Sequence, residues 1–328
     1  MDTRILGRTG IEVGVVGMGG LFVSRYGGHD RDEARRAVHR ALELGVNYVD
    51  TAPGYLDSEA VLGYALAGAP RPYYLATKLG GRPQPFDPRD KDGLRRSVEE
   101  SLRLLNRDYI DVLLIHEPDR PGQYDWWTDS ERFHGPVSEV LDDLKAQGII
   151  RFSGLGGTTA YELPYIIETG RYDVVLTAFN YSLLWREATR EVLPAATRQG
   201  MGIIVGSPLQ QGALARRYDD EIRSGARWLS APRREQYRRL YAFLDEVAMS
   251  LPEVALRFVL SNPAIHMTLM GARSVAEVEA NVRAAEKGPL PADILAHLQE
   301  IADLVPFRPF EEPFSLPFDR PYKGPGHA

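Results

Sequence analysis

Short segments rich in β-branched residues alternate with longer segments of helical periodicity along the whole chain. Because a strand followed by a helix is the repeating unit of parallel α/β folds, this alternation predicts repeated βα units. Residues 112–115 are apolar on both faces, as expected for a parallel strand covered by helices. The predicted strands are Val15–Met18, Asn47–Asp50, Tyr73–Thr77, Tyr109–His116, Ile150–Gly154, Asp173–Thr177, Met201–Val205 and Ile265–Met270. The predicted helices that follow them are Arg31–Leu44, Ser58–Leu66, Asp90–Leu105, Pro136–Gln147, Ala160–Glu168, Glu187–Gln199, Pro252–Leu260 and Ser274–Ala284.

Eight such units in 328 residues favour an α/β fold of the (β/α)8 TIM-barrel type, with residues 1–328 as a single domain. A doubly wound sheet with a second domain is the alternative, but no linker or sharp change of composition divides the chain. Thr3–Leu6 and Ile11–Val13 predict an N-terminal hairpin, and Arg233–Met249 predicts an added helix before the eighth unit. Pro-Phe pairs recur in the C-terminal tail, residues 305–328, which is therefore expected to be irregular.

Composition excludes several classes of function. Lys and Arg total 39 against 45 Asp and Glu, and the resulting net charge of −6 disfavours nucleic acid as a partner. The chain has no cysteine, which excludes disulfides, thiolate nucleophiles and cysteine-bound metals, and its scattered histidines predict no metal site. The N-terminus does not resemble a signal peptide and no apolar run is long enough for a membrane span, so we expect a cytoplasmic protein without a membrane partner.

Two glycine-rich segments follow predicted strands, at residues 17–20 and 154–157. Each resembles the start of a dinucleotide-binding fingerprint, but Phe22 and Thr159 occupy the position of the third glycine. Walker A, G-x-S-x-G and H-E-x-x-H motifs are absent. The glycines alone are thus weak support for a Rossmann fold.

Polar residues stand at the carboxyl ends of consecutive predicted strands, which form the active face of a barrel. Asp50 ends one strand, Lys78 follows the next, and His116 ends the third, while Tyr55 lies in the loop after Asp50. The lysine is informative because the chain has only five lysines against 34 arginines. Each residue alone could be a cap or a hydrogen-bonded core group, but together they predict a catalytic site.

These four side chains suit proton delivery to a carbonyl oxygen. A tyrosine has a pKa of about 10, and a neighbouring ammonium such as that of Lys78 is expected to lower it. Asp50 would keep Lys78 charged and oriented, and His116 would hydrogen-bond the oxygen that Tyr55 protonates. Because no side chain donates hydride, the site implies a nicotinamide cofactor.

The segments 47–59, 76–78 and 114–119 resemble the signatures of the aldo-keto reductase family. The resemblance extends from Leu6 to Asn281 and implies that Asp50, Tyr55, Lys78 and His116 form the catalytic tetrad of that family. It also implies that the loop after the seventh strand lies along the cofactor pyrophosphate and that residues 271–274 bind adenine and its ribose. The cofactor-binding residues so implied are Gly19, Gly20, Gly156, Gly157, Ser207, Pro208, Leu209, Gln211, Gly212, Arg273, Ser274, Glu277 and Asn281.

The chain departs from the family pattern around the nicotinamide. Gly156 and Gly157 replace a Ser-Asn pair found in many relatives, and Gly206 replaces an aromatic residue that stacks on the nicotinamide ring. Phe179, Tyr181 or Trp185 are the candidates for a substitute ring.

The residues near the adenine ribose favour NADP(H) slightly over NAD(H). Arg273 and Ser274 suit a 2′-phosphate, whereas Glu277 would repel one and could accept a hydrogen bond from a 2′-hydroxyl. An exposed helix cap is the alternative explanation for Arg273 and Ser274.

The resemblance implies an NAD(P)(H)-dependent oxidoreductase that transfers hydride to or from the carbonyl carbon of an aldehyde, ketone or sugar. One alternative is an NAD-dependent aldose 1-dehydrogenase that forms a sugar lactone. A second is a regulatory subunit that binds cofactor without turnover, like the channel β subunits of the family. The candidate residues for the pocket of the small-molecule substrate are Trp126, Trp127 and Tyr181. The sequence leaves open whether the protein is a monomer or a homo-oligomer.

Overall fold

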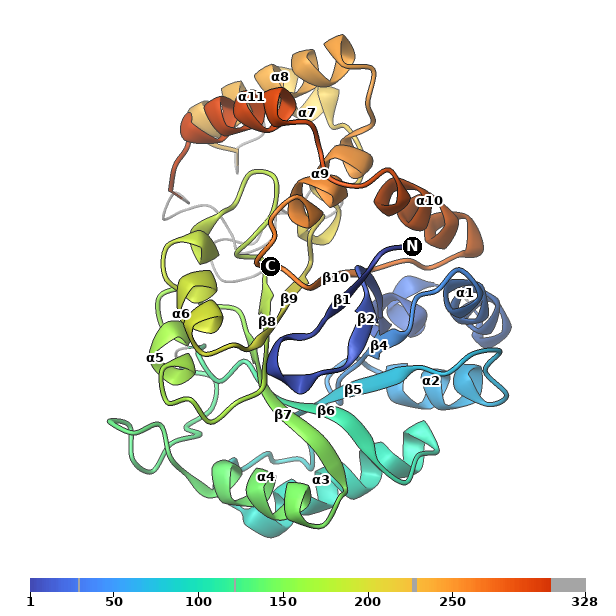
Figure 1. Cartoon of the computed structure of the whole chain (residues 1–328), viewed down its shortest axis with the longest axis vertical. Coiled ribbons are helices and arrows are strands. Elements are labelled where there is room, and N and C mark those ends of the chain that lie inside the picture. Colours follow the sequence, from blue (N-terminus) through green and yellow to red (C-terminus); the bar gives the residue numbers. More distant parts are fainter. Residues whose placement is uncertain (29, 121, 226–228, 308–328) are drawn as a thin grey trace.

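Eight parallel strands close into a barrel at the centre of the molecule (Figure 1). The structure is a computed structural model that describes residues 1–28, 30–120, 122–225 and 229–307. Around the barrel the strands follow one another in chain order, with the last, β10, between β9 and β3. The strands are β3 Val16–Gly19, β4 Tyr48–Asp50, β5 Tyr74–Leu79, β6 Ile110–His116, β7 Ile150–Gly157, β8 Val174–Ala178, β9 Gly202–Gly206 and β10 Met267–Met270. The predicted TIM barrel is confirmed.

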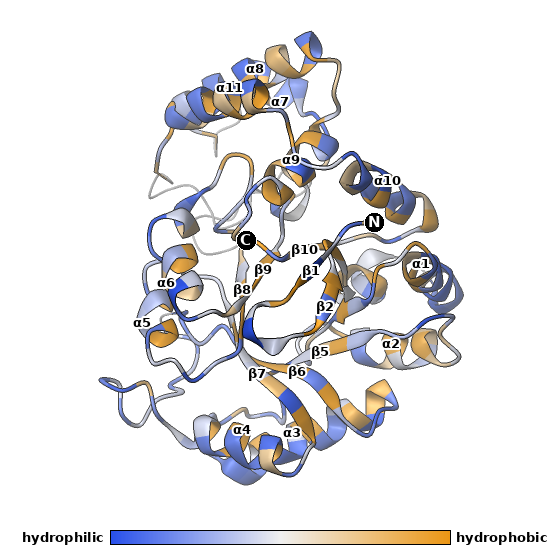
Figure 2. Cartoon of the chain, viewed as in Figure 1, coloured by the Kyte–Doolittle hydropathy of each residue, from blue (hydrophilic) through white to orange (hydrophobic). Residues whose placement is uncertain are grey.

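A ring of helices covers the outside of the barrel (Figure 1). In α1 (Arg31–Glu43) the buried residues recur every three or four positions, and the Asp30 side chain caps the helix by accepting from Glu33 N at 2.7 Å. Figure 2 shows the hydrophilic face of α1 on the outside of the ring. The other helices that follow strands in the repeat are α2 Ser58–Leu66, α3 Lys91–Leu105, α4 Pro136–Ala146, α5 Leu163–Ile167, α6 Val192–Arg198, α9 Leu251–Leu260 and α10 Val275–Glu286.

Two of the predicted helices start later than the hydrophobic pattern indicates, because each contains a proline. The prediction Ala160–Glu168 shortens to α5, and Glu187–Gln199 divides into a 3-10 turn, Glu187–Thr189, and α6. Pro164 and Pro194 then lie in the first turn of their helices, where the missing N–H costs nothing. A longer helix would set each proline ring against the carbonyl four residues earlier.

Within the part of the chain that the structure describes, three helices stand outside the repeat, and the sequence predicted one of them. The predicted Arg233–Met249 is α8, Ala231–Glu246. It is joined by α7 (Asp219–Ser224) and by α11 (Ala292–Asp303), which packs on α8. The Gln236 side chain of α8 donates to Ile301 O and Ala302 O at the end of α11, at 2.9 and 3.0 Å. The predicted irregular tail lies outside the described residues from position 308 onward.

The predicted N-terminal hairpin closes one end of the barrel (Figure 1). It pairs β1 (Thr3–Ile5) with β2 (Glu12–Gly14) across a 3-10 turn, Gly7–Thr9. Leu6, Ile11 and Val13 are buried in one cluster with barrel-facing side chains such as Val112. The hairpin therefore plugs the amino-terminal end and leaves the carboxyl end for the site.

No helix among the described residues combines the length and the apolar character that a bilayer span requires.

The fit of the hairpin plug can be tested at two glycines with positive φ. A Cβ on Gly7 (φ +49°) would lie 2.3 Å from Gly202 N, whereas a Cβ on Gly10 (φ +71°) has open space around it. We expect Gly10→Ala to cost about 1 kcal/mol from the left-handed backbone alone, and Gly7→Ala to cost about 3 kcal/mol or more. Urea unfolding measures both. Equal losses would contradict the close contact between the hairpin and β9.

Candidate active site

The four polar residues singled out by sequence come together at the carboxyl end of the barrel. Asp50, Lys78 and His116 end or nearly end three neighbouring strands, β4, β5 and β6. Because side chains alternate along a strand, all three face the barrel interior in its uppermost layer. Tyr55 follows β4 on the loop that leads into α2, and the Lys78 ammonium lies 4.8 Å from the centre of its ring.

The lysine is held by fixed partners in a dry environment. Lys78 is 2% exposed, and its Nζ donates to Asp50 Oδ2 and to Thr51 O, each at 2.7 Å. Thr51 is fixed in turn, because its hydroxyl bonds the Ser58 hydroxyl at 2.7 Å and the Ser58 hydroxyl donates to Gly20 O at 2.7 Å. The start of α2 and the end of β3 thus both help to position the ammonium, and the remaining proton of Lys78 is free to face Tyr55.

Burial and charge act in opposite directions on the tyrosine. Desolvation raises the pKa of Tyr55 above its ordinary value of about 10, and the charge of Lys78 opposes this increase without cancelling it. The expected net lowering of the Tyr55 pKa is therefore wrong for this structure. Desolvation alone would lower the pKa of Lys78, but Asp50 and Tyr55 raise it above its usual value. The pair therefore combines a protonated tyrosine with a charged lysine.

The histidine stands edge-on to the tyrosine and carries no charge at neutral pH. The rings of His116 and Tyr55 lie 5.7 Å apart, centre to centre, at an angle of 81°. Burial lowers the pKa of His116 to about 3, and the charges of Lys78 and Arg120 contribute to this shift. A neutral imidazole can still donate one hydrogen bond from a ring N–H. His116 is thus suited to hold an oxygen atom beside Tyr55 without supplying a positive charge.

The opposite half of the same layer has almost no side chains. Gly156, Ala178 and Gly206 end or nearly end β7, β8 and β9. A Cβ on Gly156 would lie 3.7 Å from Lys78 Cδ, and one on Gly206 would lie 2.9 Å from Leu176 Cδ2. These three residues, which we call the floor, carry no side chain larger than a methyl group, and a Cβ on Gly206 would already meet Leu176. The backbone of the floor is therefore uncovered by long side chains of its own, which is compatible with a flat group such as nicotinamide lying against it.

The first pair of glycines in the predicted cofactor site has a packing role. A Cβ on Gly20 would lie 2.7 Å from Ser58 Oγ and 2.8 Å from Asp50 O, so a side chain there would displace the support of Lys78. A Cβ on Gly19 would lie 3.1 Å from Met270 O on the neighbouring strand. Close packing explains both glycines without a ligand.

Two of the three candidate substitute rings are buried away from the floor. Tyr181 stacks on Phe258 of α9 at 5.5 Å, and its hydroxyl accepts from Asn262 Nδ2 at 3.1 Å. Trp185 is 3% exposed in the same hydrophobic cluster. These contacts assign both rings to the packing between the barrel and its helices. Phe179 directly follows the floor residue of β8 and stays half-buried, which makes it the best positioned of the three rings.

The candidate tryptophans of the substrate pocket differ in their surroundings. Trp126 is 1% exposed and lies beside the histidine, because a Cβ on Gly80 would lie 3.1 Å from His116 Cβ and 3.6 Å from Trp126 Cζ2. Trp127 is half-buried and packs edge to face against Phe133. Of the two, Trp126 is the one adjacent to the polar half of the site.

The loop after β9 bends sharply over the end of the barrel. Ser207 has a φ of +53°, and the buried Gln210 donates from Nε2 to Phe179 O at 2.8 Å and to Ser182 Oγ at 3.3 Å. Gln210 therefore ties the loop to the end of β8. The other predicted cofactor residues of this loop are Pro208 and Leu209, then Gln211 and Gly212 in a 3-10 turn.

The predicted adenine segment forms the capped start of α10. The Ser274 side chain accepts from Glu277 N at 3.3 Å, so it serves as the helix cap. Glu277 accepts from Arg273 N at 2.7 Å and pairs with the Arg273 guanidinium at 3.2 Å. Asn281 lies on α10, one turn further along the helix. The positive charge of Arg273 is thus already matched by a carboxylate.

The site contains residues that the sequence analysis did not single out. Thr51 supplies a carbonyl ligand to Lys78, Gln210 holds the loop after β9, and Asp119 accepts from Thr158 N and Thr159 N. The contribution of a backbone carbonyl cannot be predicted from residue identity, because every residue carries one. Asp119, in contrast, lies three residues after His116, and a carboxylate so close to a strand end was a usable signal.

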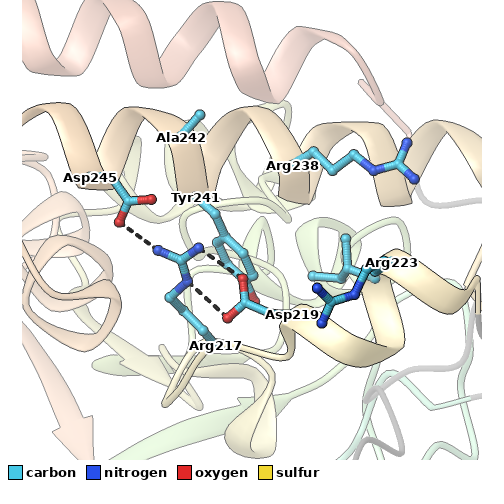
Figure 3. A pocket seen from close by; sticks show the side chains of 8 residues that line it. Arg217, Asp219, Arg223, Arg238, Tyr241, Ala242 and Asp245 are labelled. Carbon is cyan, nitrogen blue, oxygen red and sulfur yellow. Dashed lines mark hydrogen bonds and ion pairs between the residues drawn. The ribbon is translucent and has the colours of Figure 1, made fainter.

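Other parts of the described chain offer weaker places for a ligand. A surface hollow of about 340 Å³ lies between α7 and α8, but Arg217 there already bonds Asp219 at 2.8 Å and Asp245 at 2.6 Å (Figure 3). Its cations are therefore largely neutralised. Among the described residues no group of three or more His, Asp or Glu side chains is arranged to hold a metal ion.

The charge state of His116 can be checked directly. With the pKa of His116 lowered to about 3, we expect its ring carbon and proton NMR signals to stay constant from about pH 8 down to pH 5. The spectrum of His116→Gln assigns those signals. A titration midpoint near pH 6.5 would contradict the desolvated site described here.

Comparison with known proteins agrees with this geometry. Residues 15–303 match the model of the Aldo/keto reductase family. L-galactose dehydrogenase of Arabidopsis thaliana is 30% identical over 87% of this chain and 88% of its own length, and D-threo-aldose 1-dehydrogenase of a Pseudomonas species is 27% identical over 84% and 89%. Aldo-keto reductase AKR11C1 from Bacillus halodurans in its holo form superposes with a TM-score of 0.73 at 28% identity and covers 93% of this chain and 97% of its own. The chain belongs to the aldo/keto reductase family of oxidoreductases, whose members use nicotinamide cofactors.

Proposed function

We propose that this protein transfers hydride between a nicotinamide cofactor and the carbonyl carbon of an aldehyde, a ketone or a sugar, with Tyr55 as the proton donor in reduction. The observation that carries the proposal is the buried ammonium of Lys78, which Asp50 and Thr51 hold against the Tyr55 ring. Burying a charged group costs free energy, even when the group is paired. Activation of a tyrosine gives a functional reason to keep such a charge.

Each residue of the site then has a separate role. Lys78 stabilises the negative charge that develops on the Tyr55 oxygen as its proton leaves. Asp50 and the Thr51 carbonyl keep Lys78 protonated and oriented. The neutral His116 donates a hydrogen bond to the substrate oxygen and so fixes its distance from Tyr55. In the oxidation direction Tyr55 acts as the general base.

The bound cofactor would supply the hydride, with its nicotinamide on the floor of Gly156, Ala178 and Gly206. The absence of side chains there lets a planar group approach the barrel end closely. Phe179 is the ring that would limit its other side.

An NAD-dependent aldose 1-dehydrogenase that forms a lactone is the second candidate. It is favoured by two relatives whose names are those of sugar dehydrogenases. The same residues serve this reaction, because oxidation of an anomeric hydroxyl needs a base at Tyr55 and a hydride acceptor on the floor. A regulatory subunit without turnover is disfavoured, since that role gives no reason to bury Lys78.

For the cofactor we now propose NAD(H) over NADP(H). The slight preference for NADP(H) depended on Arg273 and Ser274, but Ser274 caps α10 and Arg273 is paired with Glu277. A 2′-phosphate would have to approach the Glu277 carboxylate and displace it from Arg273, whereas a 2′-hydroxyl could donate to it. We also propose a small carbonyl or sugar substrate and a cytoplasmic location. The net charge of −6 disfavours a nucleic-acid partner.

Tyr55→Phe tests the proton donor. It removes only the hydroxyl, so we expect kcat to fall roughly 10²- to 10⁴-fold while the dissociation constant for NADH stays within about twofold. Stopped-flow absorbance with a panel of aldehydes, ketones and aldoses measures the rate, and protein fluorescence measures cofactor binding. Tyr64→Phe is the matched control, because the Tyr64 hydroxyl bonds Asp32 on the outside of the barrel. Full activity of Tyr55→Phe would assign the proton to another group.

Glu277→Gln tests the cofactor preference. It frees the charge of Arg273 and removes repulsion of a 2′-phosphate, so we expect the ratio of the NADPH to the NADH dissociation constant to fall about threefold to tenfold. Glu279→Gln on the same helix, whose carboxylate bonds Arg40, is expected to leave this ratio unchanged. Tighter binding of NADPH than of NADH by the unmodified protein would refute the preference proposed here.

A further inference from the structure

A buried carboxylate bridges the ends of β6 and β7 next to the site. Asp119, 4% exposed, lies on the loop after β6. Its Oδ2 accepts from Thr158 N at 2.9 Å and from Thr159 N at 2.6 Å, and its Oδ1 lies 3.1 Å from Thr158 N. Both threonines belong to the turn after β7. One side chain from the histidine loop therefore fixes the backbone of the neighbouring loop.

The neighbouring glycine provides the space that this carboxylate occupies. A Cβ on Gly157 would lie 2.7 Å from Asp119 Oδ2 and 2.5 Å from Leu163 Cδ2 at the start of α5. A side chain at position 157 would have to displace the carboxylate or the helix. Gly157 is therefore explained by its contact with Asp119, independently of any cofactor.

The same turn is continuous with the floor of the site. His116 pairs with Gly156 in the sheet, and Glu117 N donates to Gly156 O at 2.7 Å. Gly156 in turn faces the Lys78 side chain, because a Cβ there would lie 3.7 Å from Lys78 Cδ and Cε. Any shift of the turn after β7 therefore moves the floor relative to both Lys78 and His116.

We infer that Asp119 is a positioning residue, which clamps the turn after β7 so that the floor at Gly156 keeps its place beside Lys78 and His116. The inference rests on the proposed function, since the floor is where the nicotinamide would lie. Asp119 touches neither substrate nor cofactor in this role. It acts through the backbone of Thr158 and Thr159.

The clamp depends on the ionised form of the carboxyl. Burial raises the pKa of Asp119 to about 6, its hydrogen bonds from Thr159 and Thr158 N–H oppose the increase, and the charge of Glu117 adds to it. Glu117 is paired with Arg120 on the same loop, while the β7 and α5 sides present backbone N–H groups and Leu163. Below about pH 6 the proton takes up one acceptor position, and the clamp weakens.

The free energy of unfolding should change with pH in the opposite direction to the strength of the clamp. Because the folded pKa of Asp119 lies above its unfolded value, its titration adds stability at low pH that is lost as pH rises through about 6. At higher pH the ionised carboxylate is thus kept at a cost in stability.

The test compares NAD⁺ dissociation constants from protein fluorescence or calorimetry for the full-length protein, Asp119→Asn and Asp119→Ala. Asparagine has the shape of aspartate without its charge, so it mimics the protonated acid. At about pH 8 we expect both variants to bind NAD⁺ several-fold to about tenfold more weakly than the unmodified protein. For Asp119→Asn the ratio to the unmodified protein should approach one at about pH 5, because Asp119 of the unmodified protein is then largely protonated and resembles the asparagine. His116 and Tyr55 do not titrate in this range, with the pKa of His116 lowered to about 3 and that of Tyr55 raised.

Asp90→Ala is the matched control. Asp90 is also a carboxylate that accepts backbone N–H bonds, at the start of α3, but it lies on the surface away from the floor. We expect its melting temperature to fall and its NAD⁺ affinity to stay unchanged. Hydrogen exchange of residues 155–163 should rise in the Asp119 variants and stay constant in Asp90→Ala.

The outcomes separate cleanly. The clamp is supported if NAD⁺ binds more weakly at pH 8, if the ratio of dissociation constants for Asp119→Asn approaches one at low pH, and if hydrogen exchange is faster. Faster exchange with unchanged NAD⁺ affinity would mean that Asp119 only stabilises the turn after β7. Unchanged exchange would mean that Asp119 does not hold that turn in place. Either result overturns the inference. If the unmodified protein binds neither NAD⁺ nor NADP⁺, the proposed function fails, and the inference falls with it.

Discussion

A lysine ammonium is buried at the end of this barrel, and much of the local structure follows from the need to keep it there. Moving a charge of this size out of water costs several kcal/mol, so every donor position must be matched. Asp50 supplies the opposite charge and Thr51 a carbonyl, while Ser58 and Gly20 hold Thr51 in register. The packing of the segments after β3 and β4 and of the start of α2 is therefore organised around the Nζ atom of Lys78 on β5.

The uppermost layer of the barrel is divided by chemistry. Charged and polar side chains occupy β4 to β6, whereas Gly156, Ala178 and Gly206 keep β7 to β9 nearly bare. In the proposed reaction, the polar half would hold the substrate and the bare half would let the cofactor lie against the backbone. The bare half has few side chains to hold its shape. Contacts from beside it, such as those of Asp119 and Gln210, do this instead.

The sequence predicts the order of the strands well because each barrel strand is short, apolar and followed by an amphipathic helix. Helix boundaries fail where a proline interrupts an otherwise good pattern, as at Pro194, and could have been corrected by the same rule that excluded proline from the tail. The helix α11 was missed although its apolar residues recur at helical spacing. Burial cannot be read from residue order, so the direction of the Tyr55 pKa shift was not predictable. The packing role of Gly157 was hidden for the same reason, since its partner Asp119 is 38 residues away in the chain.

The hairpin closes the amino-terminal end of the barrel, so in the part of the chain that the structure describes the barrel is open only at its carboxyl end. Leu6, Ile11 and Val13 are packed into its base, so among the described residues the amino-terminal end of the barrel is filled by side chains. In the proposed reaction, cofactor and substrate would therefore both enter from the carboxyl end of the barrel. The molecule on the floor would bind first and leave last. The hairpin at one end of the barrel would thus determine the order of binding at the other end, although none of its residues would touch a ligand.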